Sequence, residues 1–376
     1  MAILGGIGGT LLAFLLVLTV LVFVHEFGHY YVARRCGVRI ETFSIGFGRE
    51  IFGWTDKAGT RWKFSLIPLG GYVKMFGDAN AASQPGADDA IPENQRGEAF
   101  PFKRLDQRAA VVAAGPLANF LFAILALAGL FIALGQPHTA PVVGEVVPDS
   151  AAAEAGFQPG DRITEIDGSG VDRFQEVQRI VTLNPDETLT IQVARAGATR
   201  TLTATPTRAE VTDSTGNTHT VGRLGIRVTG VEYRRLGPVS ALGAAASETW
   251  SLTTGTLKAV GQIIGGSRST DELGGPIRIA QMSGEVASNG VANLIFFMAV
   301  LSVNLGLINL FPVPMLDGGH LVFYAIEAVR GRPLGERAQE YGFRIGLALV
   351  LTLMLFVTWN DLVQLQVFDF FKNLVT

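Results

Sequence analysis

Four stretches of the chain are apolar over a length that suits a membrane-spanning helix. They run from about Gly6 to Ala33, Ala109 to Leu134, Ala292 to Ala325 and Ile345 to Trp359. About 20 apolar residues in a helix cross a hydrocarbon core of about 30 Å. The pattern therefore predicts a polytopic α-helical membrane protein with four transmembrane helices.

The first apolar stretch is expected to remain as a transmembrane helix. Secretory signal peptides begin with basic residues and end at a small-residue cleavage site. Here Met1 to Thr10 carries no charge, and the first basic residue is Arg34. The stretch also continues without a break to His25 and His29.

The apolar stretches and the segments between them predict seven parts. They are a first transmembrane helix at 1–35, a cytoplasmic-side loop with a β-hairpin at 36–108, a second transmembrane helix at 109–135, an α+β domain at 138–207, a strand and amphipathic-helix region at 208–290, a third transmembrane helix at 291–328 and a fourth at 343–363. One competing span, Val239 to Leu257, is rich in Ser and Thr and carries Glu248. We predict that it is a helix on the membrane surface.

Basic residues predict the orientation of the helices. They follow the first span at Arg34, Arg35 and Arg39, and they join the third span to the fourth at Arg330, Arg332, Arg337 and Arg344. Lys and Arg are enriched in cytoplasmic loops. Both flanks should therefore be cytoplasmic, which places both termini and the segment 136–289 on the outer side.

The composition agrees with a membrane protein that carries some soluble mass. Of the 376 residues, 48% are hydrophobic and only 17% are charged. A net charge of −3 argues against a nucleic-acid partner. The single cysteine, Cys36, can form neither an internal disulfide nor a Cys-based metal site, so we expect it to pack in the fold.

Ionisable residues in the first span point to metal chemistry. His25-Glu26-Phe27-Gly28-His29 is an H-E-x-x-H arrangement, and residues four apart share one face of a helix. A carboxylate near the bilayer centre costs roughly 2.5 to 3.5 kcal/mol, so a function is expected there. Two imidazoles can bind Zn²⁺ while the glutamate accepts a proton from water. The alternative is a chance match with histidines that neighbouring groups satisfy.

A third ligand is predicted at Asp317 in the third span. Asp317 lies ten residues before Glu327, and His25 lies nine before Arg34. At about 1.5 Å per helical residue, both side chains would sit about 13 to 15 Å above the cytoplasmic edge. A helix-end or turn aspartate before Gly318 and Gly319 is the alternative. His320 could support the site or simply pack between helices.

Three motifs in this order resemble the site-2 protease family, most closely its RseP-type (regulator of sigma-E protease) bacterial members. They are the H-E-x-x-H motif, Gly115-Pro116-Leu117-Ala118-Asn119 in the second span, and "NLGLINLFPVPMLDG" from Asn304 to Gly318. The resemblance implies that His25, His29 and Asp317 bind Zn²⁺ and that Glu26 is the general base. Asn119 would help to stabilise the oxyanion, and Asn304, Asn309, Pro312 and Pro314 would shape a substrate groove. These Asn and Pro residues could instead cap or kink membrane helices.

Residues Arg61 to Phe76, "RWKFSLIPLGGYVKMF", are too apolar for an ordinary loop. Partial alternation predicts two strands joined by a turn at Gly70-Gly71. We expect a re-entrant β-hairpin that lines the active-site cavity and offers a strand edge to an unwound substrate. In the family a similar loop carries a Gly-x-Gly element, matched by Gly46-Phe47-Gly48. A hairpin that only anchors the loop at the membrane interface is the alternative.

The segment Ala140 to Thr205 predicts a small α+β module. It combines a helix capped near Asp149 and Ser150, a turn at Pro159-Gly160-Asp161, a helix from about Arg173, and strands around 189–193 and 200–204. It resembles a circularly permuted PDZ domain, although no conventional carboxylate-binding glycine loop is evident. PDZ grooves bind a peptide as an added strand.

The resemblance implies an intramembrane zinc endopeptidase of a bacterial inner membrane. Its partners would be single-span membrane proteins of the anti-sigma-factor kind, cut first on the outer side, and membrane lipid. Two other classes stay open: a membrane metal transporter, which would use Glu26 as a ligand, and a PDZ-bearing scaffold, which would need no zinc ligands.

Overall fold

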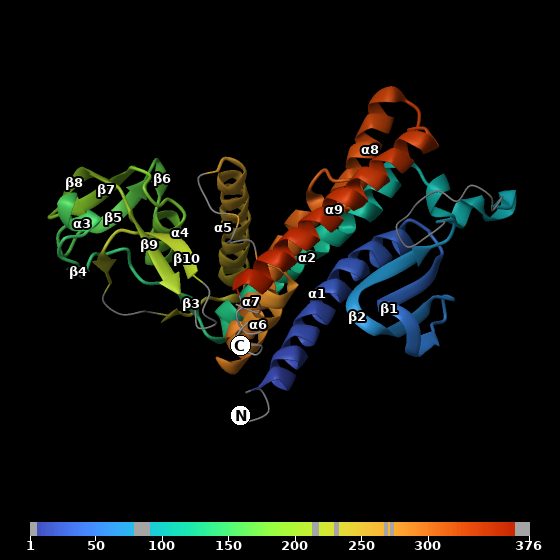
Figure 1. Cartoon of the computed structure of the whole chain (residues 1–376), viewed down its shortest axis with the longest axis horizontal. Coiled ribbons are helices and arrows are strands. Elements are labelled where there is room, and N and C mark those ends of the chain that lie inside the picture. The colour runs from blue at the N-terminus through green and yellow to red at the C-terminus, as the bar shows by residue number, and fades with distance from the viewer. Residues whose placement is uncertain are drawn as a thin grey trace, which may run out of the picture. The chain divides into compact units, whose positions relative to one another are not determined.

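The computed structural model describes residues 6–78, 91–212, 218–228, 233–266, 270 and 274–364. The chain forms two compact units (Figure 1). The first unit comprises Met1–Leu127, Ala245–Thr253 and Leu273–Asp361, and the second comprises Ala128–Ala244, Thr254–Glu272 and Leu362–Thr376.

Four helices in the described part of the chain are long and apolar enough to cross a membrane. They are α1 (Ile7–Arg35), α2 (Leu105–Ala133), α7 (Val291–Leu310) and α9 (Glu336–Gln364). Their number agrees with the hydrophobic pattern. The competing segment forms α5 (Pro238–Ile264), which continues beyond the predicted end at Leu257 and is not one of the four.

The third span is not one continuous helix, and the prediction of a single helix over 291–328 is wrong. The helix α7 ends at Leu310, and α8 (Asp317–Arg330) begins after a six-residue break. Pro312 and Pro314 lack the N–H groups that a helix needs, and each disfavours helical backbone in the residue before it. Phe311 is accordingly extended, with φ −62° and ψ 144°. The break places Asp317 in the first turn of α8.

The glycines after Asp317 allow α8 to start close to the end of α7. A Cβ atom on Gly318 would lie 2.3 Å from the carbonyl oxygens of Leu310 and Phe311, and one on Gly319 would lie 2.3 Å from that of Val313. Only glycine fits at these two positions without a shift of the backbone.

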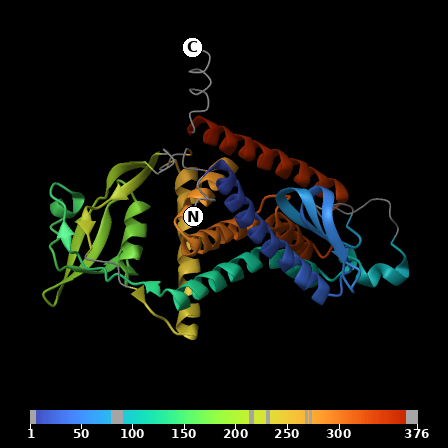
Figure 2. The same cartoon turned by 90° about the horizontal axis from the view of Figure 1, so that it is seen from below.

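A curled antiparallel sheet packs against α1 (Figure 2). It consists of β1 (Ile40–Thr55) and β2 (Arg61–Met75), which are joined through Asp56–Thr60. The Asp56 side chain accepts hydrogen bonds from the N–H groups of Ala58 and Thr60, and Gly59 has φ +86°. This Asx-type turn, and not Gly70-Gly71, is the tight turn of the hairpin. The chain does reverse before Gly71, but by a wide bend within β2, so that the rows 61–64 and 71–75 run in opposite directions without pairing with each other.

Gly70 and Gly71 lie inside β2, where Gly71 permits close packing. A Cβ atom on Gly71 would lie 2.7 Å from both the Ser44 carbonyl oxygen and Val22 Cγ1. Gly71 therefore reflects the contact between the sheet and α1, whereas Gly70, with φ +122°, lies at the bend of β2. The residue pattern of β2 alone does not show that α1 packs so closely against Gly71.

Both strands bend back, so that the backbone of the hairpin forms four rows lying side by side in one sheet. Ile45 pairs with Gly71 on one side and with Phe64 on the other. The row 71–75 therefore lies at one edge of the sheet, and the row 50–55 lies at the opposite edge. Residues of α1, α2, the rows 40–45 and 71–75 and the connections next to them form a buried cluster: Ala33, Val38, Ile40, Phe43, Val73, Met75, Phe100, Val111 and Val112. Cys36 packs against this cluster, as expected.

One further helix of the first unit contacts both α1 and α9. The helix α6 (Pro276–Ser288) packs along α1, and a Cβ atom on its Gly284 would lie 2.4 Å from Thr10 Oγ1. The carboxylate of Asp361 on α9 accepts hydrogen bonds from the N–H groups of Gly275, Ile277 and Arg278. It thereby caps the N-terminus of α6. Short 3-10 helices lie at Glu93–Glu98 and Phe100–Phe102.

The second unit contains the predicted α+β module. Its elements are β3 (Gln136–Pro137), β4 (Glu145–Val146), α3 (Ala151–Glu154), β5 (Arg162–Ile166), β6 (Ser169–Gly170), α4 (Phe174–Thr182), β7 (Leu189–Arg195), β8 (Ala198–Ala204), β9 (Thr207–Thr212), β10 (Thr218–Arg223), β11 (Ile226–Arg227) and β12 (Tyr233–Arg234). Ser150 caps α3, and α4 starts after Arg173, as predicted. The sheet order is β6-β5-β7-β8.

The core of this module extends past its predicted end at residue 207. Leu224 is buried in the same cluster as Ile163, Ile191 and Val193, and β11 pairs with β4. The segment 221–227 and α4 also form the walls of a groove of about 620 Å³.

A buried ion pair stabilises the module. The Asp161 side chain is fully buried and accepts two hydrogen bonds from the Arg195 guanidinium, at 2.6 and 2.7 Å. Burial acts to raise the pKa of the Asp161 carboxyl, but the bonds from Arg195 and from the Gln158 N–H outweigh it and hold the pKa below its ordinary value. Asp161 is therefore ionised at neutral pH, and this contribution to stability is lost only as the pH falls through the lowered pKa.

Candidate metal centre

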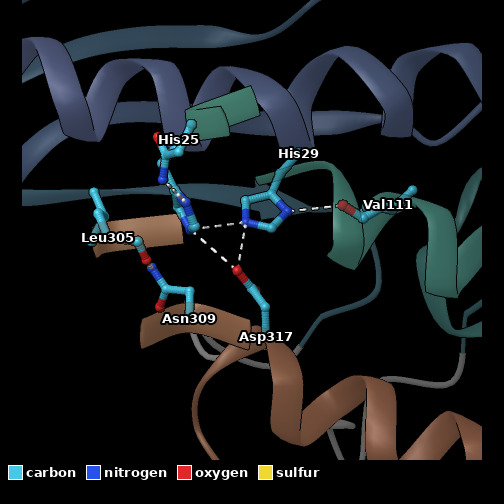
Figure 3. Close-up of polar contacts among 7 residues, drawn as sticks. His25, His29, Val111, Leu305, Asn309 and Asp317 are labelled. Atoms are coloured by element: carbon cyan, nitrogen blue, oxygen red, sulfur yellow. Dashed lines mark hydrogen bonds and ion pairs between the residues drawn. The ribbon is translucent and has the colours of Figure 1, made fainter. Parts of the chain in front are cut away.

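Two histidines of α1 face one point inside the first unit (Figure 3). His25 and His29 are one helical turn apart, and their Nε2 atoms lie 3.3 Å from each other. Each imidazole is largely buried, with 12% and 11% of its side chain exposed. The spacing on α1 thus produces the shared face that the sequence predicts.

Asp317 meets both histidines from the start of α8. Its Oδ2 atom lies 3.3 Å from His25 Nε2 and 3.5 Å from His29 Nε2. In the described part of the chain, these three residues are the set of His, Cys, Asp and Glu side chains whose ligand atoms come within 4.8 Å of one another. The structure therefore brings together the three ligands expected from the sequence.

The separations fit a tetrahedral zinc ion. Zinc bonds of about 2.0 to 2.2 Å in tetrahedral geometry separate neighbouring ligand atoms by about 3.3 to 3.6 Å. The three separations of 3.3, 3.3 and 3.5 Å lie in that range. Asp317 Oδ2 is also buried without a well-formed hydrogen bond. Two nitrogen atoms and one carboxylate oxygen leave a fourth position for water or substrate, as in catalytic zinc sites.

Contacts from α2 hold the two rings. His29 Nδ1 lies 2.9 Å from the carbonyl oxygen of Val111, and His25 Nδ1 lies 3.1 Å from the side-chain amide of Asn119. Both histidines thus have Nε2 directed to the cluster and Nδ1 directed to a group on α2. Metal-bound histidines are commonly oriented in this way.

Two glycines allow α1 and α2 to approach closely at the cluster. A Cβ atom on Gly28 would lie 2.3 Å from the Ala114 carbonyl oxygen, and one on Gly115 would lie 2.2 Å from His29 Nε2 and 2.9 Å from His25 Cε1. Both glycines lie inside the motifs that carry the family resemblance, but the sequence alone indicates no role for either. Only the packing of the two helices shows why no side chain fits there.

A cavity of about 190 Å³ opens beside the cluster. Its described lining comes from α1 (His25, Glu26, His29), β2 (Gly71, Tyr72, Val73, Met75), Phe100, Val112, the end of α7 (Asn309) and the start of α8 (Met315, Asp317, His320). Glu26 therefore lies in the wall next to the ligands, and its carboxylate accepts a hydrogen bond from the backbone of Val73. The sheet lines the cavity, as predicted for the hairpin.

The other expected site residues lie at different places. Asn309 lines the cavity, and its side-chain N–H donates to the Leu305 carbonyl oxygen at 3.1 Å (Figure 3). Asn304, Pro312 and Pro314 do not belong to the described lining. His320 does, and its ring packs against Phe343 with centroids 5.3 Å apart, which agrees with a role in helix packing.

The Gly46-Phe47-Gly48 element forms the bend of β1. Gly46 and Gly48 have φ values of +89° and +85°, which favour glycine. The Phe47 ring stacks on Tyr72, with centroids 6.1 Å apart, and Tyr72 lines the cavity. Gly46, Phe47 and Gly48 are not in the described lining of the cavity, and Phe47 contacts that lining at Tyr72.

Comparisons with known proteins agree with this site. Residues 13–353 match Peptidase family M50. A Rhizobium meliloti protein named as a zinc metalloprotease is 50% identical over 359 residues, which cover 94% of this chain and 96% of that protein. The metalloprotease MmpA of Caulobacter vibrioides is 42% identical, over 97% of this chain and 98% of MmpA. The regulator of sigma-E protease RseP of Escherichia coli is 35% identical, over 94% of this chain and 98% of RseP.

Proposed function

Because the chain belongs to peptidase family M50 and is a zinc metalloprotease, we propose that it is an endopeptidase that cuts substrates within the membrane. The observation that carries this proposal is the position of the ligand cluster. His25 and His29 lie on α1, a helix long and apolar enough to span a bilayer, and Asp317 follows a break after a second such helix. A membrane metal transporter could use Glu26 as a further ligand, but Glu26 is not among the three residues whose ligand atoms converge. A PDZ-bearing scaffold would require no such cluster.

The proposed roles follow from the geometry. His25, His29 and Asp317 hold the zinc ion. Zinc supplies a Lewis acid that polarises the scissile carbonyl and the attacking water. Glu26 is the general base: its carboxylate accepts a proton from the water and delivers it to the leaving amine. The hydrogen bond from the Val73 backbone holds that carboxylate at the cavity wall.

We propose that the substrate binds as an extended strand along the sheet edge at 71–75. This edge row lines the cavity beside Glu26, and added strands bind through main-chain hydrogen bonds. An extended substrate exposes the peptide bond that helical hydrogen bonding would protect. Asn309 would contact the substrate from the end of α7, whereas Asn304, Pro312 and Pro314 would act on the groove only indirectly, through the end of α7 and the break after it. Gly46, Phe47 and Gly48 would support the edge through Tyr72.

The same sheet is proposed to be a re-entrant element. Its outer rows expose large apolar side chains, including Ile51, Phe52 and Leu66, each more than 60% exposed. Contiguous apolar surface of this kind is rare on a soluble loop. Insertion among lipid or against the substrate helix would cover it, whereas an interfacial anchor remains the second interpretation.

We propose that the α+β module of the second unit is a PDZ-type domain. Its groove lies between α4 and the segment 221–227, in which Leu224 and Gly225 connect β10 to β11, and apolar side chains such as Phe174 and Val177 line it. Such a groove fits an extended peptide. The predicted end of the module at residue 207 had left this segment out.

The proposed substrates are single-span membrane proteins of the anti-sigma-factor kind that an earlier protease has cut on the outer side. The proposed location is a bacterial inner membrane, with both termini in the periplasm. Two observations support the location and the substrate class: the arginines that flank α1 and α9, and the similarity to RseP. Both predicted terminal segments, 1–5 and 365–376, lie outside the described residues.

Metal removal from the purified protein tests the proposed activity. A single-span reporter in proteoliposomes is expected to be cut within its membrane segment by the untreated protein, and treatment with a zinc chelator should stop the cleavage because no Lewis acid remains. Added Zn²⁺ should restore it. Mass spectrometry of the two products locates the cut. A cut outside the membrane segment, or activity that survives complete zinc removal, would refute the proposal.

Removal of the module tests whether it acts as a size filter. Pro137 pairs with Tyr233 across β3 and β12, so a two-residue Asn-Gly turn can replace residues 138–232 and leave that strand pair closed. We expect the shortened protein to keep cleaving a pre-trimmed reporter and to begin cleaving one with a bulky outer domain. The Glu26→Gln change in the shortened protein is the control. Loss of cleavage of the trimmed reporter in folded, zinc-loaded protein would show that the module is a required docking site.

A further inference from the structure

We propose that Asn119 is a positioning residue for the zinc ligand His25: its side-chain oxygen accepts a hydrogen bond from His25 Nδ1–H and fixes the ring with Nε2 directed to the metal. This inference rests on the proposed ligand set of His25, His29 and Asp317. It replaces the expected role of Asn119 as an oxyanion donor.

The two nitrogen atoms of His25 have different surroundings. Its Nε2 atom faces the other two ligands, at 3.3 Å from His29 Nε2 and 3.3 Å from Asp317 Oδ2. Its Nδ1 atom faces the other way and lies 3.1 Å from the carboxamide of Asn119. Only Nε2 is therefore placed to bind a metal shared with His29 and Asp317.

This arrangement determines which atom of Asn119 must face the ring. A neutral imidazole that binds metal through Nε2 carries its proton on Nδ1, so Nδ1 becomes a hydrogen-bond donor. The carboxamide nitrogen is also a donor, and two donors do not bond. A half-turn of the carboxamide exchanges its oxygen and nitrogen, which are nearly identical in shape. With the oxygen on Nδ1–H, the contact becomes a normal hydrogen bond.

A second observation independently supports this rotation. With the nitrogen facing His25, Asn119 Oδ1 is buried and has no hydrogen-bond partner in the described structure. A buried acceptor without a hydrogen bond is unfavourable, because it has lost water and gained no partner. The rotated carboxamide gives this oxygen the His25 donor.

The surroundings of Asn119 fit a residue that supports the metal ligand His25, and they do not fit a residue that contacts substrate. The residue is 0% exposed and is not part of the described lining of the cavity. Its backbone oxygen accepts a hydrogen bond from Ser302 Oγ on α7 at 2.9 Å, which ties α2 to α7 at this level. His29 has an equivalent support in the Val111 carbonyl oxygen, so each histidine is held by one acceptor on α2.

Two substitutions test whether the Asn119 side chain accepts a hydrogen bond from His25 or donates one to the oxyanion. Asn119→Leu has a similar shape but no acceptor, whereas Asn119→Asp keeps two acceptor oxygens and no donor. We expect the Leu variant to raise the zinc dissociation constant by roughly 10- to 100-fold, because outer partners of zinc ligands contribute about that much. The Asp variant should stay within a few-fold of the wild type. Asn119→Ala is a second acceptor-free variant with no added bulk.

The readout is zinc affinity of the purified full-length protein, measured by competition with a chromophoric chelator, with helical content checked by circular dichroism. Ser302→Ala is the matched control and should keep wild-type zinc affinity. It removes the hydrogen bond that the Asn119 carbonyl oxygen accepts and leaves the side-chain contact with His25 in place. His25→Ala sets the value expected for a lost ligand.

The outcomes distinguish the inference from the proposed function. Wild-type zinc affinity in Asn119→Leu and Asn119→Ala, together with weak binding in His25→Ala, would overturn the positioning role alone. Equal loss of affinity in Asn119→Asp and Asn119→Leu, both folded, would overturn the acceptor role. Wild-type affinity in His25→Ala would overturn the ligand set itself. Unchanged zinc affinity with a lowered kcat in all three Asn119 variants would instead assign Asn119 to the oxyanion.

Discussion

Replacing Glu26 by Gln is expected to lower cleavage of a membrane-embedded substrate by about 10²- to 10⁴-fold, the usual contribution of a general base. Zinc content should remain about one ion per chain. Glu26 lies in the cavity wall beside the ligands but is not one of the three residues whose atoms converge. A glutamine has the same shape and can keep a contact with the Val73 backbone, but it accepts no proton from water.

The measurement is initial-rate cleavage of the reporter in proteoliposomes, with zinc determined on the same sample. Glu340→Gln is the matched control, because Glu340 forms an exposed ion pair with Arg344 on α9 and exposed pairs contribute little. Its activity should equal that of the wild type. Normal turnover by the Glu26→Gln protein would remove the general-base role and the proposed mechanism with it.

Replacing Gly115 by Ala is expected to empty the zinc site. The added Cβ would lie 2.2 Å from His29 Nε2, the atom proposed to bind the metal, and 2.9 Å from His25 Cε1. Contacts this short force either α2 or the imidazoles to move, and overpacking of this kind costs about 1 to 3 kcal/mol. Zinc content should fall from about one ion per chain to near zero, and cleavage should fall with it.

Gly129→Ala provides the control on the same helix. A Cβ atom at Gly129 meets nothing within 4 Å, so this change should leave zinc content and activity intact. Alanine also favours a helix over glycine by roughly 0.5 to 1 kcal/mol, so neither change weakens α2 itself. Full zinc occupancy in Gly115→Ala, measured by atomic emission, would contradict the packing of α1 against α2 described above.

The ligand cluster could be predicted because its signals are local. The spacing of His25 and His29 sets their shared face through helical geometry alone. The depth of Asp317 followed from counting residues back from charged positions at the membrane edge, and the stretch from Asp317 to Arg330 is indeed helical. The count remained valid although α7 and α8 are separate helices, because it used only residues after the break.

The break and the turn were missed for two different reasons. Pro312 and Pro314 indicate that α7 ends before them, but the long apolar run on both sides of them led to the prediction of a single helix. The Asp56–Gly59 turn also carries its own signal, which the more prominent Gly70-Gly71 pair obscured. In both cases the local chemistry was present in the sequence.

Other features depend on packing that no local pattern records. The sequence cannot show that Gly115 touches both imidazoles or that Asn119 faces His25, because both contacts arise where α1 and α2 cross. The role of Asn119 as an oxyanion donor was therefore expected from the resemblance alone. The structure places its carboxamide 3.1 Å from His25 Nδ1, and the positioning role that we propose rests on this contact.

The cluster joins the beginning of the chain to its end, and this has a consequence during biosynthesis. The histidines emerge from the ribosome early, whereas Asp317 follows α7 and is held by its packing against the end of that helix. On the proposed ligand set, a nascent chain that ends before Asp317 has two ligands and no complete site. Zinc binding therefore requires α1 and α8 to be assembled, and it stabilises the assembled fold over its precursors.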